Sequence, residues 1–280
     1  MMTVGSTVIA SKFIAASMPP FLATALRFAF ALPVLATLLL LQRERWPKLT
    51  RSDWGLLLLQ AGAGSVGYTA LLITGLAHLA ATDAGVILGT LPAVCALFSV
   101  VVLGERPGLR LLISVLLATL GVMAVGWKGT GPSSLTGMLC IIGAVVCESA
   151  FILLNKRMPV PLKPLLQATT MTGLGLLVSL PAAFFELPIA APSTSAIAAI
   201  VWYALVPTVG GFLLWYGGAA RVTGSEAAAF TAVAPLTAVA LAALVLGERI
   251  GWVQALGVAA VIGAILILTL PIHPQVRSAA

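Results

Sequence analysis

The sequence predicts an all-α membrane protein in which ten transmembrane helices form two inverted five-helix repeats. Three observations support this prediction. The 280 residues are 60% hydrophobic and only 8% charged, whereas soluble domains carry about 25% charged residues. Apolar segments close to membrane-spanning length follow one another along the chain, and the two halves of the chain repeat the same landmarks.

Ten apolar segments have nearly the roughly 20 residues that a helix needs to cross a bilayer. In hydrocarbon every backbone amide needs an internal partner, so segments this long and apolar must be helices. The strands of a membrane barrel would be shorter and half polar. The segments cover residues 2–17, 20–41, 53–76, 82–103, 109–127, 135–155, 164–186, 195–219, 225–246 and 251–270.

An internal repeat divides the chain. Val-Leu-Gly-Glu-Arg occurs at 102–106 and again 143 residues later at 245–249. An offset of 143 or 144 also relates Pro92 to Pro235, Lys12 to Lys156 and Pro20 to Pro164. The predicted domains are a first repeat over 1–127, a second over 135–270 and a cytoplasmic tail over 271–280. Because each repeat holds five spans, an odd number, the second enters the membrane inverted, an arrangement typical of secondary transporters.

The basic residues predict that both termini are cytoplasmic. In this orientation only Lys128 and Arg249 lie on the outer side, and eleven basic residues lie on the inner side, as the positive-inside rule requires. The net charge of +7 therefore reflects topology and not a nucleic-acid partner. We expect a bacterial cytoplasmic (inner) membrane protein embedded in the lipid bilayer. The inner residues are Arg43, Arg45, Lys48, Arg51, Arg106, Arg110, Lys156, Arg157, Lys163, Arg221 and Arg277.

Several motifs resemble the EamA repeat of the drug/metabolite transporter superfamily. The run from Pro19-Pro20-Phe21 to Ala25-Leu26-Arg27-Phe28 resembles the second helix of that repeat, and Gly5-Ser6 resembles its shortened first helix. The mid-helix prolines and the apolar runs into Leu-Gly-Glu-Arg are similar as well. The resemblance covers roughly 2–127 and 135–270. It implies ten helices, cytoplasmic termini and export of small metabolites such as amino acids.

The first helix is shorter than its counterpart. Lys12 follows only eleven residues, whereas the sixth segment begins near Leu135, 21 residues before Lys156. Sixteen residues at about 1.5 Å each cover roughly 24 Å, short of a ~30 Å hydrocarbon core. We therefore expect a helix shortened at its cytoplasmic end, with truncation favoured over burial among its neighbours.

Ionisable residues within the spans are candidate site residues, because a central charge costs about 2.5–3.5 kcal/mol on insertion scales. Glu148 could carry a proton or bind a substrate ammonium, or it could be a neutral acid bonded to a neighbouring helix. Arg27 could bind a substrate carboxylate, or it could snorkel or pair structurally. His78, between the third and fourth spans, lines the outer mouth or is a solvated loop residue.

Prolines and aromatic residues complete the candidate pathway. A proline within a helix removes one amide and frees the carbonyl four residues earlier, which in a membrane must face a cavity or find a partner. Pro92 and Pro235 therefore predict paired kinks beside a central pathway, with merely tolerated kinks as the alternative. Tyr68, Trp215 and Tyr216 could form an amphipathic wall for an amino acid or an aromatic metabolite.

The sequence predicts a secondary transporter that exports a small-molecule substrate by alternating access, with protons as a candidate coupling ion. Cys95, Cys140 and Cys147 lack paired metal-ligand spacing, and no phosphate-binding loop is present. We therefore expect no metal, cofactor or enzymatic activity. The alternatives are a lipid-linked or nucleotide-sugar carrier, for which Arg27 is the one candidate phosphate ligand, and an intramembrane enzyme. Both a monomer and a homodimer fit the sequence.

Overall fold

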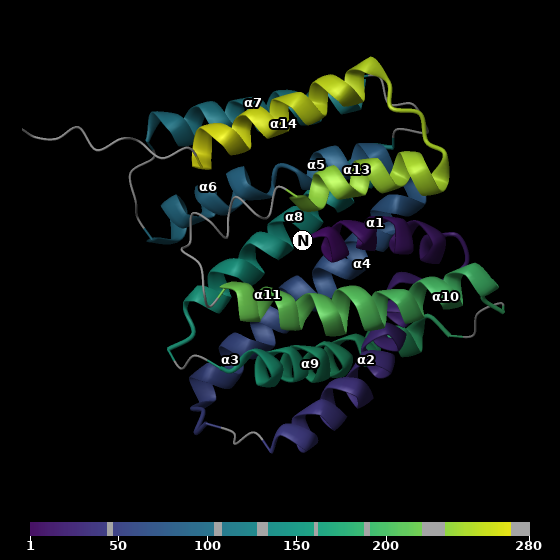
Figure 1. The fold of residues 1–280 in the computed structure, drawn as a ribbon, viewed down its shortest axis with the longest axis vertical. Coiled ribbons are helices and arrows are strands. Elements are labelled where there is room, and N and C mark those ends of the chain that lie inside the picture. Colours follow the sequence, from purple (N-terminus) through teal and green to yellow (C-terminus); the bar gives the residue numbers. More distant parts are fainter. Residues whose placement is uncertain are drawn as a thin grey trace, which may run out of the picture.

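The computed structural model describes residues 1–43, 47–103, 108–127, 134–159, 162–187, 191–219 and 233–269. Every regular element within these ranges is helical. The helices lie in successive layers, with α7 (Leu109–Trp127) and α14 (Trp252–Thr269) side by side at one edge (Figure 1).

The helices of the first half begin with local signals. Pro20 opens α2, as expected for a residue whose missing amide needs no partner there, and Thr50 and Asp53 form a capping box at the start of α3. The chain then continues as one helix through a π-helical segment, η1. The elements are α1 (Met2–Ala15), α2 (Pro20–Gln42), α3 (Arg51–Gln60), η1 (Ala61–Gly67), α4 (Tyr68–His78), α5 (Ala81–Leu88) and α6 (Leu91–Leu103), followed by α7.

The second half repeats this order. Its elements are α8 (Leu135–Lys156), α9 (Pro164–Phe185), α10 (Thr194–Tyr203), η2 (Ala204–Gly210), α11 (Gly211–Ala219) and α13 (Val233–Leu246), followed by α14. The start of the predicted ninth segment, residues 225–232, and the predicted tail lie outside the described residues.

Five described helices are long and apolar enough to cross a membrane, and the remaining predicted segments form shorter apolar helices. Met2–Ala15 is among the shorter ones. The five long helices cover Pro20–Gln42, Arg51–His78, Leu135–Asn155, Pro164–Phe185 and Thr194–Gly218.

The repeat seen in the sequence is also structural. The two π-helical segments lie 143 residues apart, the same offset as the Val-Leu-Gly-Glu-Arg pair. Equivalent helices run antiparallel. The Leu22 amide at the start of α2 donates to Glu186 at the end of α9 (2.7 Å), and Ser114 near the start of α7 donates to the Ala264 carbonyl late in α14 (2.8 Å). The two halves are therefore inverted relative to each other.

The predicted fourth span differs from the expectation of one helix kinked at Pro92. It is broken at Gly89–Thr90 into α5 and α6, and Pro92 is the second residue of α6. A proline there lacks an amide that would have no helical partner in any case. The Thr90 hydroxyl donates to the Ile87 carbonyl (2.7 Å) at the break, which satisfies one group of the last turn of α5. Pro235 is the third residue of α13, and the residues that precede this helix, 220–232, lie outside the described part of the chain.

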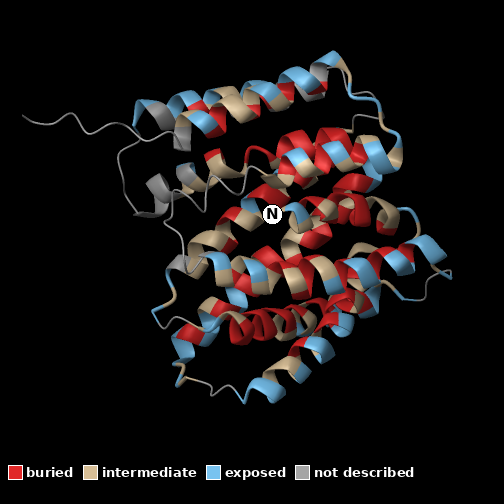
Figure 2. Cartoon of the chain, in the orientation of Figure 1, coloured by how far each residue is buried: buried red, intermediate tan, exposed pale blue. Residues whose placement is uncertain are grey.

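Burial follows the layers. One core cluster joins α1, α4, α5, α8 and α13, and a second joins α2, α3, α8, α9 and α11. Figure 2 shows exposed residues along α7 and α14 and a largely buried α9. The exposed residues of the edge pair are mostly large and apolar, among them Leu112, Leu116 and Leu256. Such a surface suits the lipid environment that the sequence predicts.

Candidate functional site

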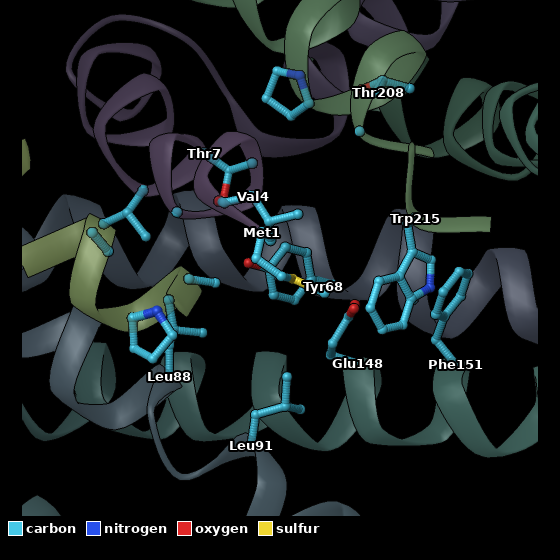
Figure 3. Close-up of a pocket in the computed structure, with 18 of the residues that line it drawn as sticks. Met1, Val4, Thr7, Tyr68, Leu88, Leu91, Glu148, Phe151, Thr208 and Trp215 are labelled. Carbon is cyan, nitrogen blue, oxygen red and sulfur yellow. The ribbon is translucent and has the colours of Figure 1, made fainter. Parts of the chain in front are cut away.

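A cavity lies between the two halves of the bundle. It holds about 1010 Å³ of empty space, including the part that is open to solvent. Its lining comes from α1, α2, η1, α4, α5 and α6 of the first half and from α8, α10, η2, α11 and α13 of the second. Figure 3 shows the cavity with many of its lining side chains, ten of them labelled.

The cavity does not extend evenly through the bundle. The lining residues of α1 come from its first half, Met1 to Val8, and those of α8 from its second half, Val145 to Ile152. On α11 the lining runs from Gly211 to Trp215. These segments lie toward the end of the bundle at which α1 begins and α8 and α11 finish. The cavity thus extends from the middle of the bundle toward the predicted cytoplasmic end.

Arg27 lies in the cavity wall and is almost fully buried, with 5% of its surface exposed. Its guanidinium carbon lies 4.2 Å from the ring centroid of Phe28 and 4.5 Å from that of Tyr203, so two aromatic faces hold the charge. One terminal nitrogen donates to the Ser65 carbonyl of η1 (3.3 Å), and Nε has no hydrogen-bond partner within the described residues. A buried donor without a partner can bind an anion.

Glu148 lies across the same cavity. Figure 3 shows its carboxyl pointing from α8 into the space between Tyr68 and Trp215. Glu148 and Arg27 both line the cavity, and no ion pair joins them among the described residues. The cavity therefore holds one positive and one negative side chain that remain separate, an arrangement that can bind two opposite charges on one ligand.

An aromatic wall adjoins Glu148. Phe151, Phe212 and Trp215 all line the cavity, and the rings of Phe151 and Phe212 stack with centroids 6.5 Å apart. The two phenylalanines were not predicted. Phe151 follows Glu148 by three residues, a spacing that places both on one helix face, so this signal was available in the sequence.

Tyr216 differs from its prediction as a cavity residue. It is buried and packs in the second core cluster, with its ring 5.8 Å from that of Phe212. Consecutive residues on a helix point about 100° apart, and here the two side chains reach different surroundings. Trp215 lines the cavity, and Tyr216 belongs to the core.

His78 and Pro92 also lie away from the cavity lining. His78 is exposed at the last position of α4, beside Gly137 of α8. Pro92 follows the lining residue Leu91, and Leu88 on the other side of the break also lines the cavity. The sequence predicted a kink at Pro92 beside the pathway. The irregularity that lies beside the cavity is instead the Gly89–Thr90 break. Of the other predicted residues, Tyr68 and Pro235 line the cavity.

Tyr203 and Phe28, which hold Arg27, were missed by the sequence reasoning. Phe28 is adjacent to Arg27 in α2, and Tyr203 is the residue that precedes η2. No local motif marks Tyr203, because its contact with Arg27 joins residues 176 positions apart. Only the packing of α10 against α2 brings them together.

Comparison with known proteins places the chain in a family. The sequence profile of the EamA-like transporter family matches residues 1–127 and 135–270. An uncharacterized transporter of Bacillus subtilis (strain 168), YetK, is 34% identical over 275 residues, covering 95% of this chain and 83% of its own length. A second from the same organism, YdeK, is 27% identical, covering 87% of this chain and 85% of its own length.

A solved crystal structure of a protein that is 22% identical matches with a TM-score of 0.67, covering 96% of this chain and 94% of the other. At this identity the likeness concerns the fold. With its apolar helices and the two-part profile match, this chain is a multi-pass integral membrane protein and belongs to the EamA-like transporter family.

Proposed function

We propose that the protein is a secondary transporter that exports small zwitterionic metabolites such as amino acids. It crosses the inner membrane ten times with both termini in the cytoplasm. The observation that carries the proposal is the cavity between inverted repeats, whose wall holds Arg27 and Glu148 as separate charges.

The two charges suit the two ends of an α-amino acid. The Nε of Arg27, which has no hydrogen-bond partner within the described residues, can donate to a substrate carboxylate, and Glu148 can accept from the ammonium group. The wall of Phe151, Phe212 and Trp215 offers apolar surface to the substrate side chain. Among the described residues neither charged group is held in a protein ion pair, so substrate binding would break none.

Transport then follows from alternating access. The cavity extends toward the predicted cytoplasmic end, and an inverted repeat supplies a second conformation of similar energy with the cavity facing outward. A proton on Glu148 would compete with the substrate ammonium for the same oxygens. This competition supports export in exchange for protons.

The cavity fits the two alternative functions, a nucleotide-sugar or lipid-linked carrier and an intramembrane enzyme, less well. A nucleotide-sugar or lipid-linked carrier needs several cations for its phosphates, and Arg27 is the one basic side chain among the described lining residues. An intramembrane enzyme needs convergent catalytic groups, and Glu148 has no nucleophilic partner hydrogen-bonded to it within the described residues.

Liposomes containing the purified protein test the proposal with three related probes. Phenylalanine carries both charges, 3-phenylpropionate lacks the ammonium, and phenethylamine lacks the carboxylate. We expect counterflow of phenylalanine and little of the other two. Equal transport of all three, or counterflow of none of a wider set of amino acids, would contradict the zwitterion site. Metabolite profiling of cells with and without the protein then identifies the natural substrate.

A further inference from the structure

Two carboxylates join the repeats at one end of the bundle. Glu186, which follows the last residue of α9, accepts from the backbone amides of Phe21 (3.3 Å) and Leu22 (2.7 Å) at the start of α2. Glu248, which follows α13, accepts from the amides of Ala81 (2.9 Å) and Thr82 (2.8 Å) at the start of α5. Each carboxylate of the second repeat thus caps a helix N-terminus of the first, where free amides and the helix dipole favour a negative charge.

Other side chains reinforce the same end. Lys12 of α1 donates to the carbonyls of Leu76 (2.8 Å) and Leu79 (2.7 Å), where α4 finishes. Gln254 of α14 donates to Asp83 of α5 (3.0 Å). The start of α5 is therefore capped by Glu248 of the other repeat and not by its own Thr82 or Asp83. The sequence did not predict this cap.

The capped helix starts lie between the cavity and this end of the bundle. Arg27 follows Leu22 by five residues, which is about 7.5 Å along a helix axis. Leu88 follows Thr82 by six residues and also lines the cavity. Separating α9 from α2 and α13 from α5 at this end is the movement that would open the cavity here.

The opposite end lacks one of these carboxylates. The offset of 144 that relates Pro20 to Pro164 makes Gln42, the last residue of α2, the counterpart of Glu186. An inner contact equivalent to the Glu186 contact would therefore bring an uncharged amide to the start of α9. A neutral side chain stabilises a helix N-terminus less than a carboxylate does, so this contact is weaker at the inner end. The counterpart of Glu248, Glu105, lies outside the described residues.

We propose that Glu186 and Glu248 form an outer latch that holds the outer side closed, and that the uncharged Gln42 in the place of Glu186 at the inner end makes the inward-open state the resting state. The outer latch rests on the proposed orientation and on alternating access. Opening the cavity to the outside would require Glu186 and Glu248 to release the backbone amides that they cap.

A thiol placed in the cavity tests the outer latch without any substrate. In a background with Cys95, Cys140 and Cys147 changed to alanine, Leu88→Cys reports access to the cavity. A membrane-impermeant, charged methanethiosulfonate reagent is applied to intact cells and to inside-out vesicles. We expect the parent to react at least tenfold faster from the inner side.

Glu186→Gln and Glu248→Gln keep the shape of each side chain and remove its charge. Because a hydrogen bond to a charged group is stronger than a neutral one by about 1 kcal/mol, each should raise the rate from outside by about fivefold. Asp53→Asn is the matched control: Asp53 also caps a helix, but it bonds Thr50 of its own helix start (2.8 Å) and joins no second repeat. Its outside rate should stay within twofold of the parent.

Gln42→Glu tests the inner end by adding the missing carboxylate, and it should also raise the rate from outside. Rates unchanged in both Glu186→Gln and Glu248→Gln would overturn the outer latch, and an unchanged rate in Gln42→Glu would overturn the account of the resting state. Either result leaves the proposed transport function standing. A Leu88→Cys parent that reacts from neither side would contradict the transport function itself, because the cavity would then be closed to water.

Discussion

The two repeats share their helices but not their chemistry. Each contains a helix interrupted by a π-helical segment at the same offset, yet the cavity charges differ between equivalent positions. Arg27 of the first repeat corresponds to Met171 of the second, and Glu148 of the second corresponds to Val4 of the first. The duplicated fold thus supplies two similar walls, and single substitutions within it create one site with a positive and a negative side. Making the repeats more alike should therefore abolish function and preserve the fold.

Replacing Arg27 by its counterpart, Arg27→Met, should have the largest effect. A hydrogen bond to a charged group is worth about 1.5–3 kcal/mol, so phenylalanine counterflow in liposomes should fall by roughly 10- to 100-fold. Arg27→Lys, which keeps the charge but not the fork of donors, should retain part of the activity. Parental counterflow in Arg27→Met, at equal protein content, would show that the charge of the first repeat is not needed.

A glycine of the first π-helical segment should respond next most strongly. A Cβ on Gly64 would lie 2.3 Å from the Cβ of Phe151, whereas nothing lies within 4 Å of a Cβ on Gly62. Gly64→Ala should therefore destabilise the protein by about 1–3 kcal/mol, as overpacking does. Gly62→Ala is its control and should melt at or above the parental temperature in detergent. Equal melting temperatures of the two variants would contradict the close approach of η1 and α8.

Glu148→Gln removes the negative charge of the second repeat and keeps the size of the side chain. Loss of one charge-assisted contact with the substrate ammonium should lower counterflow about tenfold. If protons are exchanged at this residue, the dependence of the rate on a pH gradient should disappear as well. Unchanged uptake and unchanged pH dependence would remove Glu148 from the mechanism.

Substitutions of Tyr203 should have the smallest effect on transport, and two of them can be compared directly. Its counterpart before η1 is Gln60, so Tyr203→Gln removes the ring that holds Arg27, whereas Tyr203→Phe keeps it. A partly desolvated cation–π contact of about 1 kcal/mol predicts a roughly fivefold rise in KM for the glutamine variant. The phenylalanine variant should stay within twofold. A similar rise in both would indicate that the hydroxyl and not the ring acts on Arg27.

Much of the fold could be predicted because hydrophobicity is a local property. The apolar segments gave the helices to within a few residues wherever the chain is described, and the repeat with its odd number of segments gave the inversion that α2 and α9 display. Arg27 and Glu148 could also be singled out, because a charge in an apolar span is conspicuous in any sequence.

Contacts between distant helices could not be predicted in this way. The sequence pointed to Pro92 as the irregularity, whereas the chain breaks at Gly89–Thr90, where Gly89 packs against α14: a Cβ there would lie 2.4 Å from Val261. It also grouped Tyr216 with Trp215, although the packing of α11 turns Tyr216 into the core.

By itself, the sequence determined that this chain is built of apolar helices in two inverted halves, since the free energy of placing a segment in lipid depends on the composition of that segment. Only the tertiary structure decided that Arg27 is held by Tyr203 and that Glu186 and Glu248 cap helices of the other repeat. Those contacts depend on the direction of side chains from helices far apart in the chain, and packing alone sets that direction.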